Sequence, residues 1–204
     1  MPVPDSGQIE LADRRIRVPY ATWRRPAIED DAEPFYGNER GNVLRLALAE
    51  LRAELAQRGL DADAGRSAPV TPVQLEFVNS IEIAVLPETR PPFAPTDFDA
   101  ASGRDGPREF ADALDRILLD GPGRDICIYM HGYKVVFENT VAVSTELWHY
   151  LDYEGAFVAF AWPATQRRLA YLGDLETAEA SATMLRRFIT YLAEQTTARR
   201  IHVI

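Results

Sequence analysis

Three short apolar runs separated by two helical patterns are the feature of this sequence that most constrains its fold. The runs Ile126–Met130, Ala156–Trp162 and the one beginning at Ile201 have the length and composition of buried strands. Between them, about Glu138–Tyr150 and about Leu175–Gln195 repeat apolar residues at helical spacing. Strands that are apolar throughout are buried on both faces, and the crossovers between them are right-handed and join parallel strands. The sequence therefore predicts an α/β fold, with a mostly parallel sheet between two helical layers.

The chain before these strands carries weaker signals. A helix is expected from Pro107, because Phe110, Leu114 and Leu118 recur on one face. The proline-rich segment 87–106 is expected to be irregular. Residues Val73–Val78 and Ile81–Leu86 are two β candidates, close enough to form a hairpin.

Two further elements are expected near the N-terminus. A short strand is predicted at Ile16–Tyr20. A helix is predicted from about Asn42 to Arg58, followed by Gly59 as a stop signal. Its apolar residues recur at helical spacing, and they are Val43, Leu44, Ala47, Leu48, Leu51 and Leu55.

Composition bounds the class of protein. The chain has 204 residues, of which 47% are hydrophobic and 26% charged, as in globular domains. Its net charge of −9 argues against a general nucleic-acid binder. A single cysteine, Cys127, excludes an intramolecular disulfide and a multi-cysteine metal site. With no signal peptide, no apolar run of membrane-spanning length and no nucleotide-binding glycine motif, a cytoplasmic protein without cofactor or bound metal is expected.

The strand ending at Met130 leads into His131, Gly132, Tyr133 and Lys134. In serine hydrolases of the α/β class, a loop at this position supplies a backbone N–H to the oxyanion hole. A glycine at the end of a strand is also common where the chain simply turns. Both interpretations remain open on these residues alone.

The segment Ile128–Ile204 resembles an uncharacterised bacterial family of α/β hydrolases, described as esterase/lipase-like. In that family a strand ends in His-Gly-Tyr, a later strand ends in an aromatic-Ala/Ser-Trp-Pro run, and a Tyr-x-x-Asp segment opens a long helix before an Ile-His-x-Ile strand. The matching residues here are His131-Gly132-Tyr133, Phe160-Ala161-Trp162-Pro163, Tyr171-Leu172-Gly173-Asp174 and Ile201-His202-Val203-Ile204. Lys134 departs from the family, where a small polar residue is commoner.

The N-terminal part resembles the same family in two short elements. Ala21–Arg24 is similar to a Thr-x-Arg element, and Phe35–Gly41 is similar to a Gly-x-x-Arg element. Arg24 and Arg40 are then either surface charges or residues that tie this segment to the core. The helix expected from Asn42 departs from the family pattern.

The resemblance implies an α/β-hydrolase fold that is truncated at its C-terminus, just before the nucleophile elbow. Residues 1–72 would form an N-terminal extension with one helix at about 42–58, and residues 73–204 the N-terminal part of the hydrolase domain. A Gly-x-Ser-x-Gly-like turn would follow Ile204, and the catalytic acid and histidine would come later. The backbone N–H groups of Tyr133 and Lys134 would hold the oxyanion, in the loop formed with His131 and Gly132.

Within this chain no residue has the setting of a nucleophile. No serine has glycines two residues away on both sides, and Ser144 and Ser181 fall in predicted helices. Cys127 lies in mid-strand, where a thiol usually packs as a small hydrophobe. His149 is expected to be a surface or packing residue of its helix, and His202 a hydrogen-bonded structural residue. No cluster of His, Asp or Glu has metal-ligand spacing.

The resemblance also suggests residues that line the substrate cleft, namely Tyr171, Asp174 and Trp162. Asp174 has a structural alternative, as the cap of a helix that begins near Leu175. Taken together, the sequence predicts a serine hydrolase of small ester or acyl substrates, whose first 204 residues are inactive alone. The alternative is a hydrolase-like binding module, complete at 204 residues, that acts without catalysis.

Overall fold

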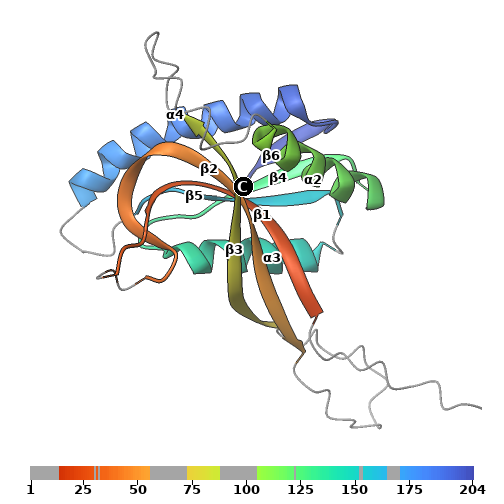
Figure 1. The fold of residues 1–204 in the computed structure, drawn as a ribbon, viewed down its shortest axis with the longest axis horizontal. Coiled ribbons are helices and arrows are strands. Elements are labelled where there is room, and N and C mark those ends of the chain that lie inside the picture. The colour runs from red at the N-terminus through yellow and green to blue at the C-terminus, as the bar shows by residue number, and fades with distance from the viewer. Residues whose placement is uncertain are drawn as a thin grey trace, which may run out of the picture.

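The computed structural model describes residues 14–29, 31, 33–55, 73–87, 105–121, 123–151, 154–164 and 171–204. These residues form one sheet with the strand order β3-β2-β1-β5-β4-β6, together with three helices (Figure 1). In chain order the elements are β1 (Arg14–Pro26), β2 (Tyr36–Leu55), β3 (Val73–Pro87), α2 (Gly106–Asp120), β4 (Asp125–Met130), α3 (Phe137–Tyr150), β5 (Ala156–Ala161), α4 (Tyr171–Gln195) and β6 (Arg200–Val203).

The C-terminal half of the sheet is parallel, as the apolar runs predict. β4 pairs with β5 on one side and with β6 on the other, in both cases parallel. β5 is buried at every position, because sheet neighbours flank it and helices cover both faces. The predicted strands and helices of this half are confirmed, with bounds that shift by a few residues.

The N-terminal half of the sheet is antiparallel. β1 pairs with β2, and β2 pairs with β3, both antiparallel. β1 then joins this half to the other by running parallel to β5 over Tyr20–Thr22. The mixed sheet is therefore still mostly parallel: three of the five strand pairings in the described residues are parallel.

The helix predicted at about 42–58 is wrong, because residues 36–55 form the strand β2. This strand lies between β1 and β3 and is covered on both faces. Leu44 and Leu46 face the core beneath α2 and α4, and Ala47 and Ala49 face the core beneath α3. A strand buried on both faces loses the polar–apolar alternation that would mark it, and its Leu, Ala, Glu and Arg content favours a helix locally.

The predicted hairpin over residues 73–86 is also wrong, since β3 is one continuous strand. Asn79 and Ser80 lie opposite Glu50 and Ala49 of β2 rather than in a turn. The register shifts near this point, between Glu50 and Leu51. A bulge of this kind bends a strand and breaks its side-chain alternation, which explains why the sequence suggested two short strands.

Helices cover the two faces of the sheet, as expected for three layers. α2 and α4 lie on one face and α3 on the other (Figure 1). Phe110, Leu114 and Phe188 fill the first core, and Phe137 and Val141 fill the second. The boundary predicted at residue 72 falls between β2 and β3, two strands that are neighbours in this sheet.

No helix in the part of the chain that the structure describes is long and apolar enough to cross a bilayer.

Candidate active site

The loop that begins at His131 lies at the C-terminal ends of the parallel strands. β4 ends at Met130 and β5 at Ala161, in parallel register with Met130 beside Phe160. On the other side of β4, the N–H of Met130 donates to the Ile204 carbonyl at 2.9 Å. The end of β6 thus lies directly beside the residue that precedes the loop. In open parallel sheets this edge is where ligands bind.

His131 is buried against Trp162, which follows β5. The two rings stack with an interplanar angle of 4° and centroids 5.3 Å apart. The indole N–H of Trp162 donates to the His131 carbonyl at 2.8 Å. The His131 ring reaches back, with Nε2 3.0 Å from the Trp162 carbonyl oxygen and Nδ1 2.7 Å from that of Gly132. These reciprocal contacts fix the start of the loop against the end of β5.

The imidazole of His131 is neutral at pH 7. Burial lowers its pKa to about 4, the hydrogen bond to the Gly132 carbonyl opposes this, and the charge of Arg24 lowers it further. A neutral ring carries one N–H and can donate to only one of the two carbonyls. His131 therefore supports the loop, and it has no charge to offer a substrate.

Tyr133 and Lys134 form the exposed tip of the loop. Tyr133 is 37% exposed, and the Lys134 ammonium lies 5.2 Å from the centre of its ring. Lys134 has a φ of 62°, the only positive value among the described non-glycine residues. Such a conformation is uncommon for a residue with a side chain and is concentrated at functional loops. A left-handed residue within a turn also directs successive N–H groups toward a common point, where an anion can bind.

Gly132 faces open space. A Cβ atom added there would have no atom of the described residues within 4 Å outside its chain neighbours. The backbone before Tyr133 is therefore accessible to a ligand on this side, and glycine is not required here by packing.

Arg24 of β1 is the largest buried side chain near the loop and is fully shielded from solvent. Its Nη2 donates to the Val135 carbonyl at 2.7 Å and lies 3.4 Å from Nε2 of His131. Its Nη1 donates to Oδ1 of Asn38 at 2.8 Å, at the start of β2. The alternative left open by the sequence is thereby decided: Arg24 ties the N-terminal strands to the loop.

The guanidinium of Arg24 keeps its charge although it is buried. Burial lowers its pKa to about 10, and the carboxylates of Glu138 and Glu33 oppose this shift. Burial in turn raises the pKa of Glu138, in the first turn of α3. Two buried atoms here have no hydrogen-bond partner in the described residues, Nε of Arg24 and Oε1 of Glu138. The site thus contains a buried cation whose partners are mainly carbonyl and amide oxygens.

The exit of the loop is anchored by aromatic packing. Phe137, the first residue of α3, contacts Tyr20, Tyr36 and Phe77 with ring centroids 4.7 to 5.6 Å apart. The hydroxyls of Tyr20 and Tyr36 are 3.0 Å apart. The loop is therefore held at three points: His131 at its start, Val135 near its end and Phe137 at its exit.

The other predicted cleft residues lie on α4 and after β5. α4 begins at Tyr171, so Asp174 lies in its first turn and not at the cap of a helix that begins near Leu175. Trp162 is 6% exposed and is bound to the loop as described above. That these residues line a substrate cleft stays a prediction. Arg40 of β2 also contacts α4, because its Nε donates to the hydroxyl of Thr177 at 2.8 Å.

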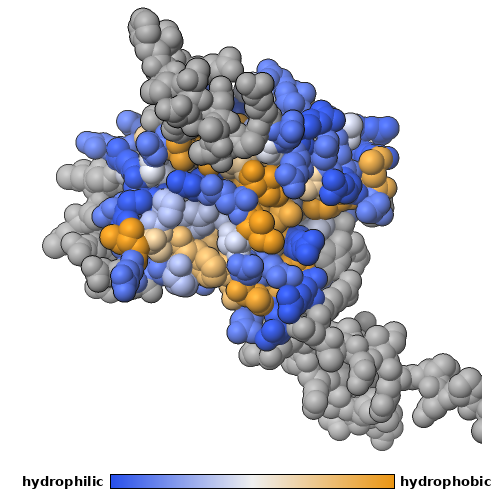
Figure 2. Space-filling model, in the orientation of Figure 1, coloured by the Kyte–Doolittle hydropathy of each residue, from blue (hydrophilic) through white to orange (hydrophobic). Residues whose placement is uncertain are grey.

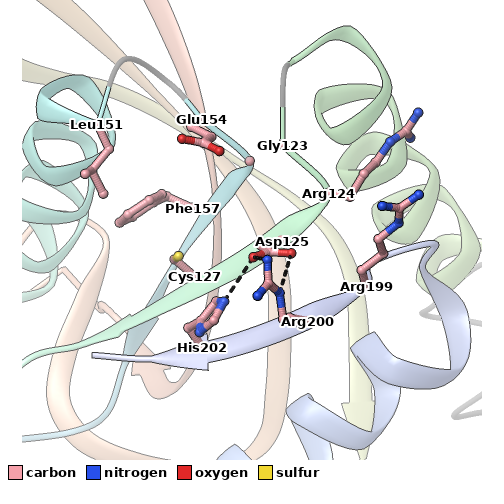
Figure 3. Close-up of a pocket in the computed structure, with 11 residues that line it drawn as sticks. Gly123, Arg124, Asp125, Cys127, Leu151, Glu154, Phe157, Arg199, Arg200 and His202 are labelled. Atoms are coloured by element: carbon pink, nitrogen blue, oxygen red, sulfur yellow. Dashed lines mark hydrogen bonds and ion pairs between the residues drawn. The ribbon is translucent and has the colours of Figure 1, made fainter.

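A hollow of about 420 Å³ lies at the opposite edge of the sheet, at the N-terminal ends of β4, β5 and β6 (Figure 3). There Asp125 binds His202 and Arg200, each at 3.1 Å, and the His202 contact chiefly lowers the pKa of Asp125. His202 is thus hydrogen-bonded in the structure, as expected. Burial raises the pKa of the Cys127 thiol, so the thiolate needed by a nucleophile is disfavoured.

The two serines that were predicted to lie in helices do so, Ser144 in α3 and Ser181 in α4. Ser181 lies in α4 and donates back to the Thr177 carbonyl at 2.7 Å, as predicted for a helical serine. Ser144 is buried in α3. No group of three His, Cys, Asp or Glu side chains in the described ranges is placed to hold a metal ion.

Comparison with known proteins supports the resemblance over the C-terminal half. Residues 107–204 match the model of a family described as "Alpha/beta hydrolase of unknown function" (DUF900). The matched region begins in α2 and includes β4, the His131 loop, β5 and β6. No curated protein and no solved structure matches the chain. This part of the chain is therefore related to an uncharacterised family of α/β hydrolases, and its mixed sheet is consistent with that fold.

Proposed function

We propose that the protein is a serine hydrolase that acts on carboxylic esters or similar acyl substrates. The observation that carries the proposal is the loop His131–Lys134 at the C-terminal edge of a parallel sheet, in a segment related to α/β hydrolases. Its open side at Gly132 and the left-handed Lys134 support an oxyanion hole made of backbone N–H groups.

In the proposed reaction a serine attacks the substrate carbonyl carbon while a histidine base removes its proton. The carbonyl oxygen becomes negatively charged in the tetrahedral intermediate. The N–H of Tyr133 and that of Lys134 would donate to this oxygen. Collapse of the intermediate breaks the ester C–O bond, and the protonated histidine gives its proton to the departing alcohol. The same histidine then removes a proton from water, which hydrolyses the acyl-enzyme, releases the acid and restores the serine. Removing one such donor typically costs about 10²–10³ in kcat.

The nucleophile in this proposal follows β6. Ile204 pairs with β4 through its N–H to the Ile128 carbonyl at 3.0 Å and through its carbonyl to Met130. A residue directly after Ile204 would emerge beside His131, where a serine on a sharp turn could reach a carbonyl held by the loop. The acid and the base would come from sequence beyond this turn. The His131 ring is excluded as the base because it is buried and its pKa is lowered to about 4.

The test is covalent labelling of the protein made from the complete reading frame. A fluorophosphonate should label one serine located after Ile204, and short-chain p-nitrophenyl esters should be hydrolysed. Residues 1–204 alone should give neither result, because an oxyanion loop without nucleophile and base cannot carry out acyl transfer. Heat-denatured protein controls for non-specific labelling. Absence of labelling in the folded complete protein would exclude the proposal.

A second candidate is a binding module that acts by strand addition. β6 is an edge strand among the described residues, and Val203 and Ile204 are 47% and 53% exposed. Figure 2 shows that apolar residues also gather near the centre of the face turned to the viewer. An edge of this kind can pair with an extended segment of another chain. A reading frame that ends at Ile204, with a folded product that no fluorophosphonate labels, would favour this candidate.

A further inference from the structure

Arg24 lies far from Val135 in sequence but contacts it directly at the site. Its guanidinium bridges two segments, with Nη1 on Asn38 of β2 and Nη2 on the Val135 carbonyl of the loop. It reaches the loop from β1, which is separated from β4 by β5 in the sheet. A single side chain thus connects the antiparallel strands with the loop that would bind the oxyanion.

We propose that Arg24 is a positioning residue for the oxyanion loop. By holding the Val135 carbonyl, it fixes the peptide plane between Val135 and Val136 and so anchors the chain directly after the residues whose N–H groups would bind the oxyanion. This inference rests on the proposed hydrolase function for its catalytic consequence. The effect on the geometry of the loop holds with or without catalysis.

Burial makes this contact selective for one loop conformation. Arg24 is fully shielded from water, so an N–H that loses its carbonyl acceptor cannot be hydrated in exchange. Rotation of the Val135 peptide would take away the carbonyl acceptor that Nη2 of Arg24 contacts at 2.7 Å and leave this buried nitrogen with the longer, 3.4 Å contact to Nε2 of His131. The left-handed φ of 62° at Lys134 is unfavourable by itself, so the loop needs a contact of this kind to hold it.

The fork of the guanidinium is needed for this role. Asn38 and Val135 accept hydrogen bonds from different nitrogens of Arg24. A lysine ammonium is a single point of charge on a flexible stem and cannot bridge both acceptors in the same way. Arg24→Lys therefore keeps the charge and much of the buried stem but removes the bridge.

The experiment compares Arg24→Lys with Arg25→Lys as a matched control. Arg25 is the next residue of β1, and its side chain binds Asp31 and Glu39 instead of the loop. Amide hydrogen exchange of residues 132–136 is measured in both variants of the 204-residue chain. In the complete protein, kcat and KM are measured with p-nitrophenyl esters. A third variant, Arg24→Met, also removes the charge. NMR titration measures the pKa of His131 in Arg24→Lys and in Arg24→Met.

Arg24→Lys should speed exchange in the loop at least about tenfold and lower kcat by about 10–100-fold, with KM changed less than about threefold. Arg25→Lys should leave the exchange rate of the loop and kcat within about twofold of the wild-type values. The pKa of His131 should stay low in Arg24→Lys and rise only in part in Arg24→Met, because only the second change removes the positive charge and burial, the larger cause of the lowered pKa, remains.

These results distinguish the positioning role of Arg24 from the proposed hydrolase activity. Loop exchange in Arg24→Lys that equals the wild type would overturn the role of Arg24, whatever the activity. Faster exchange in a complete protein that no fluorophosphonate labels would keep the positioning role and exclude the hydrolase. A loss of kcat with unchanged loop exchange would also overturn the inference, since Arg24 would then act by another route.

Discussion

At the scale of single residues, two buried side chains with different charge states define the candidate site. Arg24 remains a cation, because the pKa of about 10 that burial leaves it is still far above neutral pH. His131 remains neutral, because burial lowers its pKa to about 4. Two cations this close would repel each other in a poorly hydrated site. Burying the two side chains next to each other is therefore favourable only while His131 is unprotonated.

This charge state predicts a pH-dependent stability. The folded pKa of His131 lies below the unfolded value near 6.5, so between about pH 6.5 and pH 4 the unfolded chain binds the proton more readily. The free energy of unfolding should fall by up to about 3 kcal/mol as the pH is lowered through this window. Arg24 is the charged group that acts on the ring, and the carboxylates of Glu138 and Glu33 act in turn on Arg24.

Urea unfolding of wild type and His131→Asn at several pH values measures this effect. The variant lacks the titrating ring but keeps a side-chain donor, so its stability should depend less steeply on pH between 6.5 and 4. The two proteins differ only at residue 131, so the difference between their pH profiles reports on the His131 ring. Parallel pH profiles would contradict the burial of a neutral His131.

At the scale of elements, the ends of the parallel strands differ in how tightly they are packed. Gly155, just before β5, has a φ of 68°, and a Cβ there would lie 2.4 Å from the Asp125 carbonyl oxygen of β4. The Gly155 carbonyl also accepts the indole N–H of Trp148 from α3. At the other end of β4, Gly132 faces open space. The entry to β5 is thus fixed by packing, and the exit from β4 is free for a ligand.

The same substitution should therefore have opposite consequences at the two glycines. Gly155→Ala should destabilise the fold by about 2 kcal/mol or more, because it adds both a clash and a left-handed alanine. Gly132→Ala should change stability by less than about 0.5 kcal/mol. In the complete protein it should nevertheless lower ester hydrolysis at least about tenfold, because its methyl group occupies the space beside the oxyanion donors.

Chemical denaturation and ester hydrolysis of the two variants measure this contrast. Full activity in a stable Gly132→Ala variant would show that the substrate does not approach the loop from this side.

At the scale of the whole molecule, the sheet consists of two halves joined at a short seam. β1 and β5 pair only over Tyr20–Thr22, whereas β1 and β2 pair along most of their length. The hydroxyl of Thr22 extends the seam by donating to the Ala161 carbonyl at 2.6 Å and accepting the N–H of Arg24 at 3.2 Å. Thr22 therefore links the seam to Arg24 and, through it, to the loop.

Thr22→Val tests the seam with little change in shape. It removes a buried hydroxyl that serves two backbone groups, so the free energy of unfolding should fall by about 1–2 kcal/mol. Thr145→Val is the matched control. The buried hydroxyl of Thr145 donates to the Val141 carbonyl within α3, which already has its helical partner, so the cost should be smaller. Urea unfolding that gives equal losses for both variants would contradict a special role for the seam.

Local patterns were sufficient to predict the parallel half and the position of the loop. Continuous apolar runs identify β4 and β5 because burial on both faces needs no polar alternation, and glycine and proline mark the ends of these elements. The pair His131-Gly132 could be assigned to the edge of the sheet because it follows a buried strand directly. These signals are carried by neighbouring residues, so the sequence by itself determines them.

Only the tertiary structure decided the state of β2 and the role of Arg24. The residues of β2 favour a helix by composition, and pairing with β1 and β3 overrides this preference. Arg24 becomes a buried cation only because Asn38, Val135 and His131 converge on it from other strands and from the loop. Both outcomes depend on hydrogen bonds between distant segments, whose energy is gained only when the whole sheet has formed.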